Sequence, residues 1–259
     1  MSDILTGADA LGALNDEGGN ENNSIDFTKF SSGTTLLVKV IGQEINGTVI
    51  GDFAMYYNYG IFKKVNSFTA KNPSKKSAKG YPIENLTPWD KAWKYHADKS
   101  KEFNDEHSKE ANKYRAKQKF MFGFIDIDSG KPIVVDLTKN QAQAVNNAIK
   151  KYGNKLDKLA FELSKEGAST NTTVSLTPYL DDLTAEQQKH FDNAPEKFDA
   201  KLFENILYQA DDDEMIELLK QAGFDVSLIG LEGGGNTDSK QAENGGGEPL
   251  EITDEELPF

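Results

Sequence analysis

The first side chains in this sequence that could do chemistry lie in an aromatic, lysine-flanked stretch. Residues 53–64 read Phe-Ala-Met-Tyr-Tyr-Asn-Tyr-Gly-Ile-Phe-Lys-Lys. Alternate residues of an extended strand share a face, so one face would carry Phe53, Met55, Tyr57, Tyr59 and Ile61, and the other Tyr56 and Phe62. One face must line a core. The other could stack on nucleic-acid bases, worth about 1–3 kcal/mol per base, although core packing explains any single ring equally well.

Lysines accompany these rings. Two of them close the aromatic stretch, and four more follow in residues 71–80, which contain turn residues and are expected to form a loop. Spaced cations on a loop could contact the phosphates of an extended strand, whereas the same lysines alone could be only solvated surface. The candidate DNA-binding residues are therefore Tyr56, Tyr57, Tyr59, Phe62, Lys63, Lys64, Lys71, Lys75, Lys76 and Lys79.

Three aspartates offer a second chemistry. Asp126 and Asp128 form an Asp-x-Asp pair, and Asp136 follows on the next predicted strand. Such carboxylates could hold two metal ions in a nuclease. However, Asp128 opens a tight-turn signature at Ser129-Gly130, which explains it without chemistry. Because no paired Glu or His completes the set, catalysis is disfavoured.

Few residues could hold a metal or act as a nucleophile. The chain has no cysteine and three histidines, His96, His107 and His190. An apolar stripe predicts one long helix from Pro88 past Tyr114, which would hold His96 and His107 about 16 Å apart, too far to share a metal. There is no Gly-x-x-x-x-Gly-Lys-Ser/Thr loop and no Gly-x-Ser-x-Gly turn. We therefore expect no catalytic residues, no metal, no cofactor and no small-molecule substrate.

Charge is distributed unevenly along the 259 residues, whose formal net charge is −13. Residues 1–26 carry six acidic residues and no base; residues 27–176 carry 24 Lys and Arg against 15 acidic residues; residues 177–259 carry 5 Lys against 21 acidic residues. The basic middle can attract a polyanion with which the acidic ends compete. No apolar run reaches the roughly 18–20 residues of a membrane span, and no secretory signal opens the chain, so we expect a soluble, cytoplasmic protein.

The elements that must position these residues follow from periodicity. We expect strands near 35–41, 48–68 (one or two), 119–127, 132–137, 159–163 and 172–176, the last two joined by a hairpin loop. Thr87 and Pro88 begin the long helix, Thr138 and Gln141 make a capping box for a helix over 139–152, and residues 183–222 are helical in pattern. The fold class is α+β: an OB-type barrel with helical insertions and a helical C-terminal region.

Composition divides the chain into five parts. We expect a flexible acidic arm over residues 1–26, a core over 27–180, an acidic helical region over 181–229 and a flexible Gly-rich linker over 230–247. Residues 248–259 form an acidic tail that ends in Asp254, Glu255, Glu256, Leu257, Pro258 and Phe259. A solubilising tail explains the three acids, but not the apolar tripeptide after them.

This ending resembles the acidic tip of bacterial and bacteriophage single-stranded-DNA-binding proteins. The body resembles the bacteriophage helix-destabilising members in the aromatic stretch Tyr56–Phe62, in Pro132–Tyr152, and in Phe161–Gly167 leading to Thr172–Pro178. The zinc-binding His and Cys of some phage members have no counterpart here. The resemblance implies an OB fold, no catalysis, DNA held by aromatic and basic residues, and a tail, residues 254–259, that recruits replication and recombination enzymes in the host cytoplasm.

The sequence thus predicts a non-enzymatic protein that binds and protects single-stranded DNA without sequence specificity during replication, recombination and repair. Its expected partners are single-stranded DNA and replication and recombination proteins, with no membrane. An acidic DNA mimic that occupies an enzyme's DNA groove is the alternative suggested by the net charge, and a metal-dependent nuclease built on the three aspartates is a third.

Overall fold

The computed structural model describes residues 27–168, 171–204 and 206–231. The expected N-terminal arm, the linker beyond Leu231 and the acidic tail lie outside these residues, and so does Ser169-Thr170 in the expected hairpin loop.

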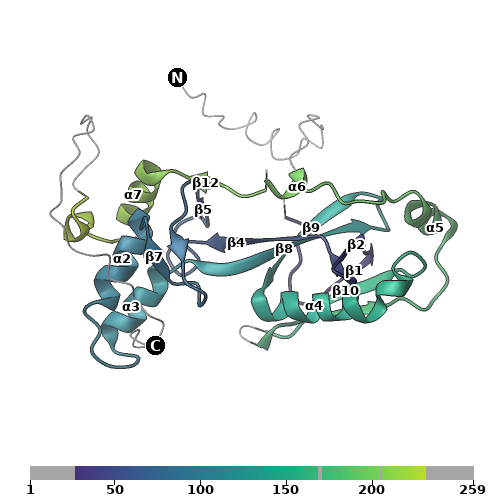
Figure 1. Ribbon diagram of the computed structural model, residues 1–259, viewed down its shortest axis with the longest axis horizontal. Coiled ribbons are helices and arrows are strands. Elements are labelled where there is room, and N and C mark those ends of the chain that lie inside the picture. Colours follow the sequence, from purple (N-terminus) through teal and green to yellow (C-terminus); the bar gives the residue numbers. More distant parts are fainter. Residues whose placement is uncertain (1–26, 169–170, 205, 232–259) are drawn as a thin grey trace, which may run out of the picture.

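A curled antiparallel sheet of six strands organises the chain (Figure 1). Its strands are β1 (Thr34–Lys39), β4 (Phe53–Asn58), β8 (Lys117–Asp126), β9 (Pro132–Thr138), β10 (Phe161–Glu166) and β11 (Thr173–Pro178). The order is β11-β10-β1-β8-β4, and β9 pairs with β8 on its other edge. The mixed α+β class expected from the sequence is confirmed, in the form of a half-barrel.

Strand β8 lies at the centre because both of its faces are apolar. Phe122 and Phe124 are buried on one face, and Met121 and Ile125 on the other. This two-sided burial matches the continuous apolar run in the sequence. The hairpin to β9 turns at residues 127–131, as the Asp128-Ser129-Gly130 signature predicted.

Helix α4 (Lys139–Tyr152) covers one face of the sheet, with Val145 and Ile149 packed among Phe122 and Phe161. It begins where predicted, because the amide of Thr138 donates to the side chain of Gln141 at 3.1 Å. A 3₁₀ turn, η1 (Gly153–Lys155), ends it at the expected glycine. The hairpin β2 (Gly42–Ile45) and β3 (Thr48–Gly51) flanks this layer.

The chain crosses the other face of the sheet after α5 (Ala185–Asp192). Phe198, and Phe203 of α6 (Lys201–Glu204), pack on Met121, Ile125 and Val134. A Cβ at position 123 would lie 2.5 Å from the ring of Phe198, so glycine is required there for this close approach. The expected helical region 183–222 is therefore interrupted: it is α5, α6, strand β12 (Gln209–Ala210) and α7 (Asp212–Gln221).

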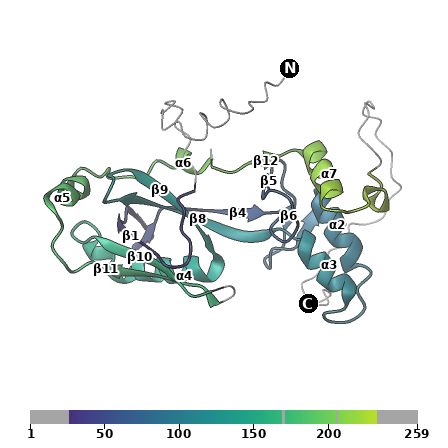
Figure 2. The same ribbon diagram turned by 180° about the vertical axis from the view of Figure 1, so that it is seen from behind.

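A second, helical core lies at the far end of β4 and β8 (Figures 1 and 2). It contains α2 (Pro88–Ala97), α3 (Glu106–Tyr114), α7 and the 3₁₀ turn η3 (Val226–Ile229). β12 pairs in parallel with β5 (Thr69–Ala70), which brings α7 to this end. The short hairpin of β6 (Lys75–Lys76) and β7 (Pro82–Glu84) occupies what the sequence suggested was only a loop.

The prediction of a single long helix from Pro88 past Tyr114 is wrong. Helix α2 ends at Ala97, Asn104 in the turn that follows has a left-handed φ of 64°, and the Asp105 side chain then accepts from the amide of Ser108 at 2.7 Å and caps α3. The chain folds back, and α2 and α3 pack together as a hairpin. None of the described helices is both long and apolar enough to cross a membrane.

Candidate nucleic-acid interface

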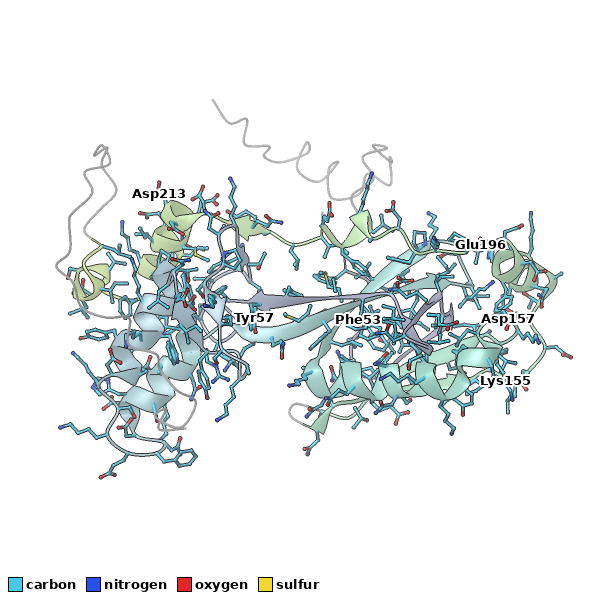
Figure 3. All side chains as sticks on the ribbon, viewed as in Figure 1. Phe53, Tyr57, Lys155, Asp157, Glu196 and Asp213 are labelled. Carbon is cyan, nitrogen blue, oxygen red and sulfur yellow. The ribbon has the colours of Figure 1, made fainter. Side chains whose placement is uncertain are left out.

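An exposed apolar face runs along β4, the strand that bridges the sheet and the helical core (Figure 3). Phe53 and Met55 are 37% and 47% exposed, and in the β4–β8 ladder they lie opposite Phe122 and Phe120 of β8. The rings of Phe53 and Phe122 stack at 5.0 Å with 16° between their planes. Buried Phe122 thus fixes the orientation of an exposed ring, and a ring held in this way can receive a flat ligand.

A cavity of about 230 Å³ adjoins this face. Its polar lining comes from α4 and comprises Lys139, Gln143 and Asn146, and its apolar lining includes Phe53 and Phe120. It is smaller than the usual pocket for a drug-sized molecule. It is therefore better described as a small hollow between the exposed rings and Lys139 than as an enclosed substrate site.

Tyr57 lies at the other end of the same face, beside the helical core (Figure 3). Its ring is half-buried, and the ammonium of Lys76 lies 5.4 Å from the ring centre. Burial raises the pKa of its hydroxyl, so the phenol stays neutral near pH 7. Tyr57 is the tyrosine among the sequence-derived candidates that remains open to a base.

Two other tyrosines are committed to the interior. Tyr56 projects to the opposite face, is buried, and donates to Asp136 at 2.8 Å. Tyr59 is 1% exposed in the helical core and donates to Asp90 at 2.9 Å. Neither ring is accessible for stacking, although Tyr59 lies two residues after Tyr57 and would share its face in a continuous strand.

Lys76 is also interior. Asp90, fully buried at the start of α2, receives bonds from Lys76, Tyr59, Ser74 and Thr87. The Lys76 side chain is 7% exposed, and its ammonium lies 3.0 Å from Asp90. Burial lowers the pKa of Lys76, and the charge of Asp90 opposes that shift. This lysine holds the β6–β7 hairpin onto α2 and is not available to DNA.

The remaining candidates are distributed over the helical end. Phe62 is 59% exposed. Lys63 pairs with Glu110 and lies over the ring of Tyr114, and Lys75 pairs with Glu84. The other three lysines, Lys64, Lys71 and Lys79, are exposed. The structure thus brings part of the predicted set to the surface and keeps Tyr56, Tyr59 and Lys76 inside.

Two cations that the sequence analysis did not single out lie at this junction. Arg115 follows α3 directly, and Lys117 opens β8. The guanidinium of Arg115 lies 4.8 Å from the ring centre of Tyr81, and the ammonium of Lys117 lies 5.2 Å from that of Phe62. The only sequence signal was that Arg115 is the single arginine of the chain.

The expected separation of the histidines is wrong. His96 and His107 face each other across the α2–α3 hairpin, with 3.1 Å between their Nδ1 atoms. Burial, and then the neighbouring His107, lower the pKa of His96. Among the residues that the structure describes, no group of three or more His, Cys, Asp or Glu side chains could hold a metal ion.

The three aspartates each have structural partners. Asp126 accepts from the amide of Ser129, and Asp128 from the side chain of Gln187. Asp136 accepts from Tyr56 and pairs with Lys119. The bonds within the turn are therefore made by Asp126, whereas Asp128, to which the sequence analysis assigned the turn, bonds to α5.

No protein-family model matches the chain, and neither a curated protein nor a solved structure matches it.

Proposed function

We propose that this protein binds single-stranded DNA without sequence specificity and protects it during replication, recombination and repair, with no catalytic step of its own. The observation that carries the proposal is the exposed Phe53–Met55 face of β4, flanked by Tyr57 at one end and by Lys139 at the other. Aromatic faces accept any base, and cations follow the phosphates.

The geometry favours single strands over duplex. Rings that lie on a sheet surface can stack only on bases whose faces are free, and the bases of a duplex are already stacked on each other. We infer that the half-barrel is of the OB type, because barrels of that type bind oligonucleotides on one open face.

The charge distribution supports this proposal over a DNA mimic. The acidic excess of the chain lies before residue 27 and after residue 176, whereas residues 27–176, which include β4, β8 and α4, carry more bases than acids. A DNA mimic needs a dense acidic surface in place of exposed rings beside lysines. The acidic tail, residues 254–259, would recruit replication and recombination proteins rather than imitate DNA.

The test is a titration of a fluorescent single-stranded oligonucleotide, and of its duplex, at two salt concentrations. We expect tight single-strand binding, with log K falling against log salt at a slope near −3 to −4 if about five phosphates are contacted. Equal affinity for duplex would contradict the proposal. Cleavage of the oligonucleotide in the presence of magnesium would instead indicate a nuclease.

A further inference from the structure

Arg115 and Lys117 bring two positive charges together where the helical core meets the sheet. One residue separates them, because the end of α3 leads directly into β8. Each side chain lies over an aromatic ring, that of Tyr81 for Arg115 and that of Phe62 for Lys117. These contacts hold both cations at the same end of β8 as Tyr57, whose partner across the ladder is Gln118.

In the described part of the chain, neither cation is in an ion pair. Within residues 27–168, 171–204 and 206–231, no carboxylate forms an ion pair with Arg115 or Lys117. Two acids of the helical core are paired with other lysines: Asp90 with Lys76, and Glu110 with Lys63 and Lys113. Asp90 is matched by Lys76, so no ion pair among the described residues compensates the charge of Arg115 or Lys117.

The charged form of Lys117 is disfavoured in this arrangement. Burial, and then the charge of Arg115, together lower its pKa to about 8. Desolvated cations are costly unless an anion accompanies them. Thus the chain holds a half-buried ammonium beside a guanidinium, and an incoming anion would relieve both the desolvation and the repulsion.

We propose that Arg115 and Lys117 form a binding site for one phosphodiester group of the DNA strand. The planar fork of arginine matches the oxygens of a phosphate, and the lysine adds a point charge. Lys117 pairs with Asn58, so it leaves β8 on the face opposite Tyr57. A strand anchored at this site must therefore pass around the end of the sheet before its next bases can reach the exposed face of β4. This inference rests on the proposed function and deepens it.

The site makes DNA binding depend on pH. A phosphate beside Lys117 favours the charged ammonium, so its pKa in the complex rises above the value near 8 of the free protein. The complex then holds more protons than the free protein, and affinity falls as pH rises above 8. Arg115, which stays charged throughout, cannot contribute to this dependence.

The experiment compares Lys117→Met and Lys117→Arg with the intact protein, and uses Lys113→Met as the matched control. Lys113 lies in α3, carries the same charge, and is already paired with Glu110. Lys117→Met should make the salt slope shallower by about 0.7, the value for one phosphate of a single strand, and should abolish the loss of affinity between pH 8 and 9.5. Lys117→Arg should restore the salt slope but not the pH dependence.

Thermal melts establish that each variant is folded, and proton uptake is measured by calorimetry in two buffers of different ionisation enthalpy. The inference is overturned if Lys117→Met keeps the slope and pH dependence of the intact protein, or if Lys113→Met changes them equally. If the intact protein itself does not bind single strands, both the proposed function and this phosphate site are wrong. Binding with no role for Lys117 overturns the phosphate site alone.

Discussion

The Nδ1 atoms of His96 and His107 lie 3.1 Å apart, although eleven residues separate them along the chain. One of the two nitrogens must donate and the other accept, so the two rings cannot both be protonated at Nδ1. The ring of His96 also stacks on Tyr114, with 7° between their planes, and meets Phe224 edge to face. This pair therefore ties α2 to α3 and to the C-terminal end of the described chain.

Acid should weaken this junction. His96 has a folded-state pKa below its ordinary value of 6.5, first because of burial and then because of His107. Folded protein then binds fewer protons than unfolded protein, so this contribution to stability is present above pH 6.5 and is lost as pH falls. Thermal melts between pH 7.5 and 5 should show it. His96→Phe keeps a ring against Tyr114 and should flatten the dependence; an unchanged profile would contradict the assignment.

Removing the exposed ring of Phe53 should weaken DNA binding without changing its salt dependence. Phe53→Ala takes away one stacking surface, at a cost of about 1–3 kcal/mol, and leaves every lysine in place. The control is Phe103→Ala, because Phe103 is 79% exposed in the turn between α2 and α3. Fluorescence titrations should separate the two variants. Equal affinities would show that bases do not reach β4.

Two adjacent lysines should behave differently when each is replaced by alanine. Lys76 is the partner of a fully buried carboxylate, so Lys76→Ala should destabilise the protein by about 3–5 kcal/mol, because it leaves Asp90 buried and unpaired. Lys75 and Glu84 are both more than half exposed, so Lys75→Ala should cost less than about 1 kcal/mol. Denaturant unfolding measures both. Equal losses would contradict the buried network around Asp90.

The acidic tail should compete with DNA for the basic middle of the chain. Residues 177–259 carry 21 acids against 5 lysines, and the linker over 230–247 would let the tail reach the core at near-millimolar effective concentration. Deleting residues 248–259 should tighten single-strand binding at low salt, and the gain should shrink as salt screens the charges. Unchanged affinity at low salt would argue against self-competition.

The apolar tip should act separately from the acids. Phe259→Ala removes the last ring but no charged side chain, so DNA affinity should stay the same while the capture of replication proteins from an extract is lost. A Phe259→Ala protein that keeps every partner would show that the tip plays no part in recruitment.

Local signals were enough to place several elements from sequence alone. The β8–β9 hairpin followed from the turn at Asp128–Gly130, and α4 from the capping pair Thr138 and Gln141. Each depends on residues a few positions apart, whose geometry is set by the backbone itself. That Phe53 and Met55 share one face of β4 likewise followed from the two-residue period of a strand, but the period did not tell which face is exposed.

Only the tertiary structure decided which of these residues are available. Tyr57 and Tyr59 would share a face in a continuous strand, but β4 ends at Asn58. Tyr59 therefore enters the helical core, where its hydroxyl donates to Asp90. An apolar stripe looks the same in one long helix and in two helices folded back on one core, so periodicity could not reveal the hairpin that joins His96 to His107. The site proposed at Arg115 and Lys117 depends on their contacts with Tyr81 and Phe62, and contacts between residues far apart in the sequence are set by packing, which sequence spacing does not encode.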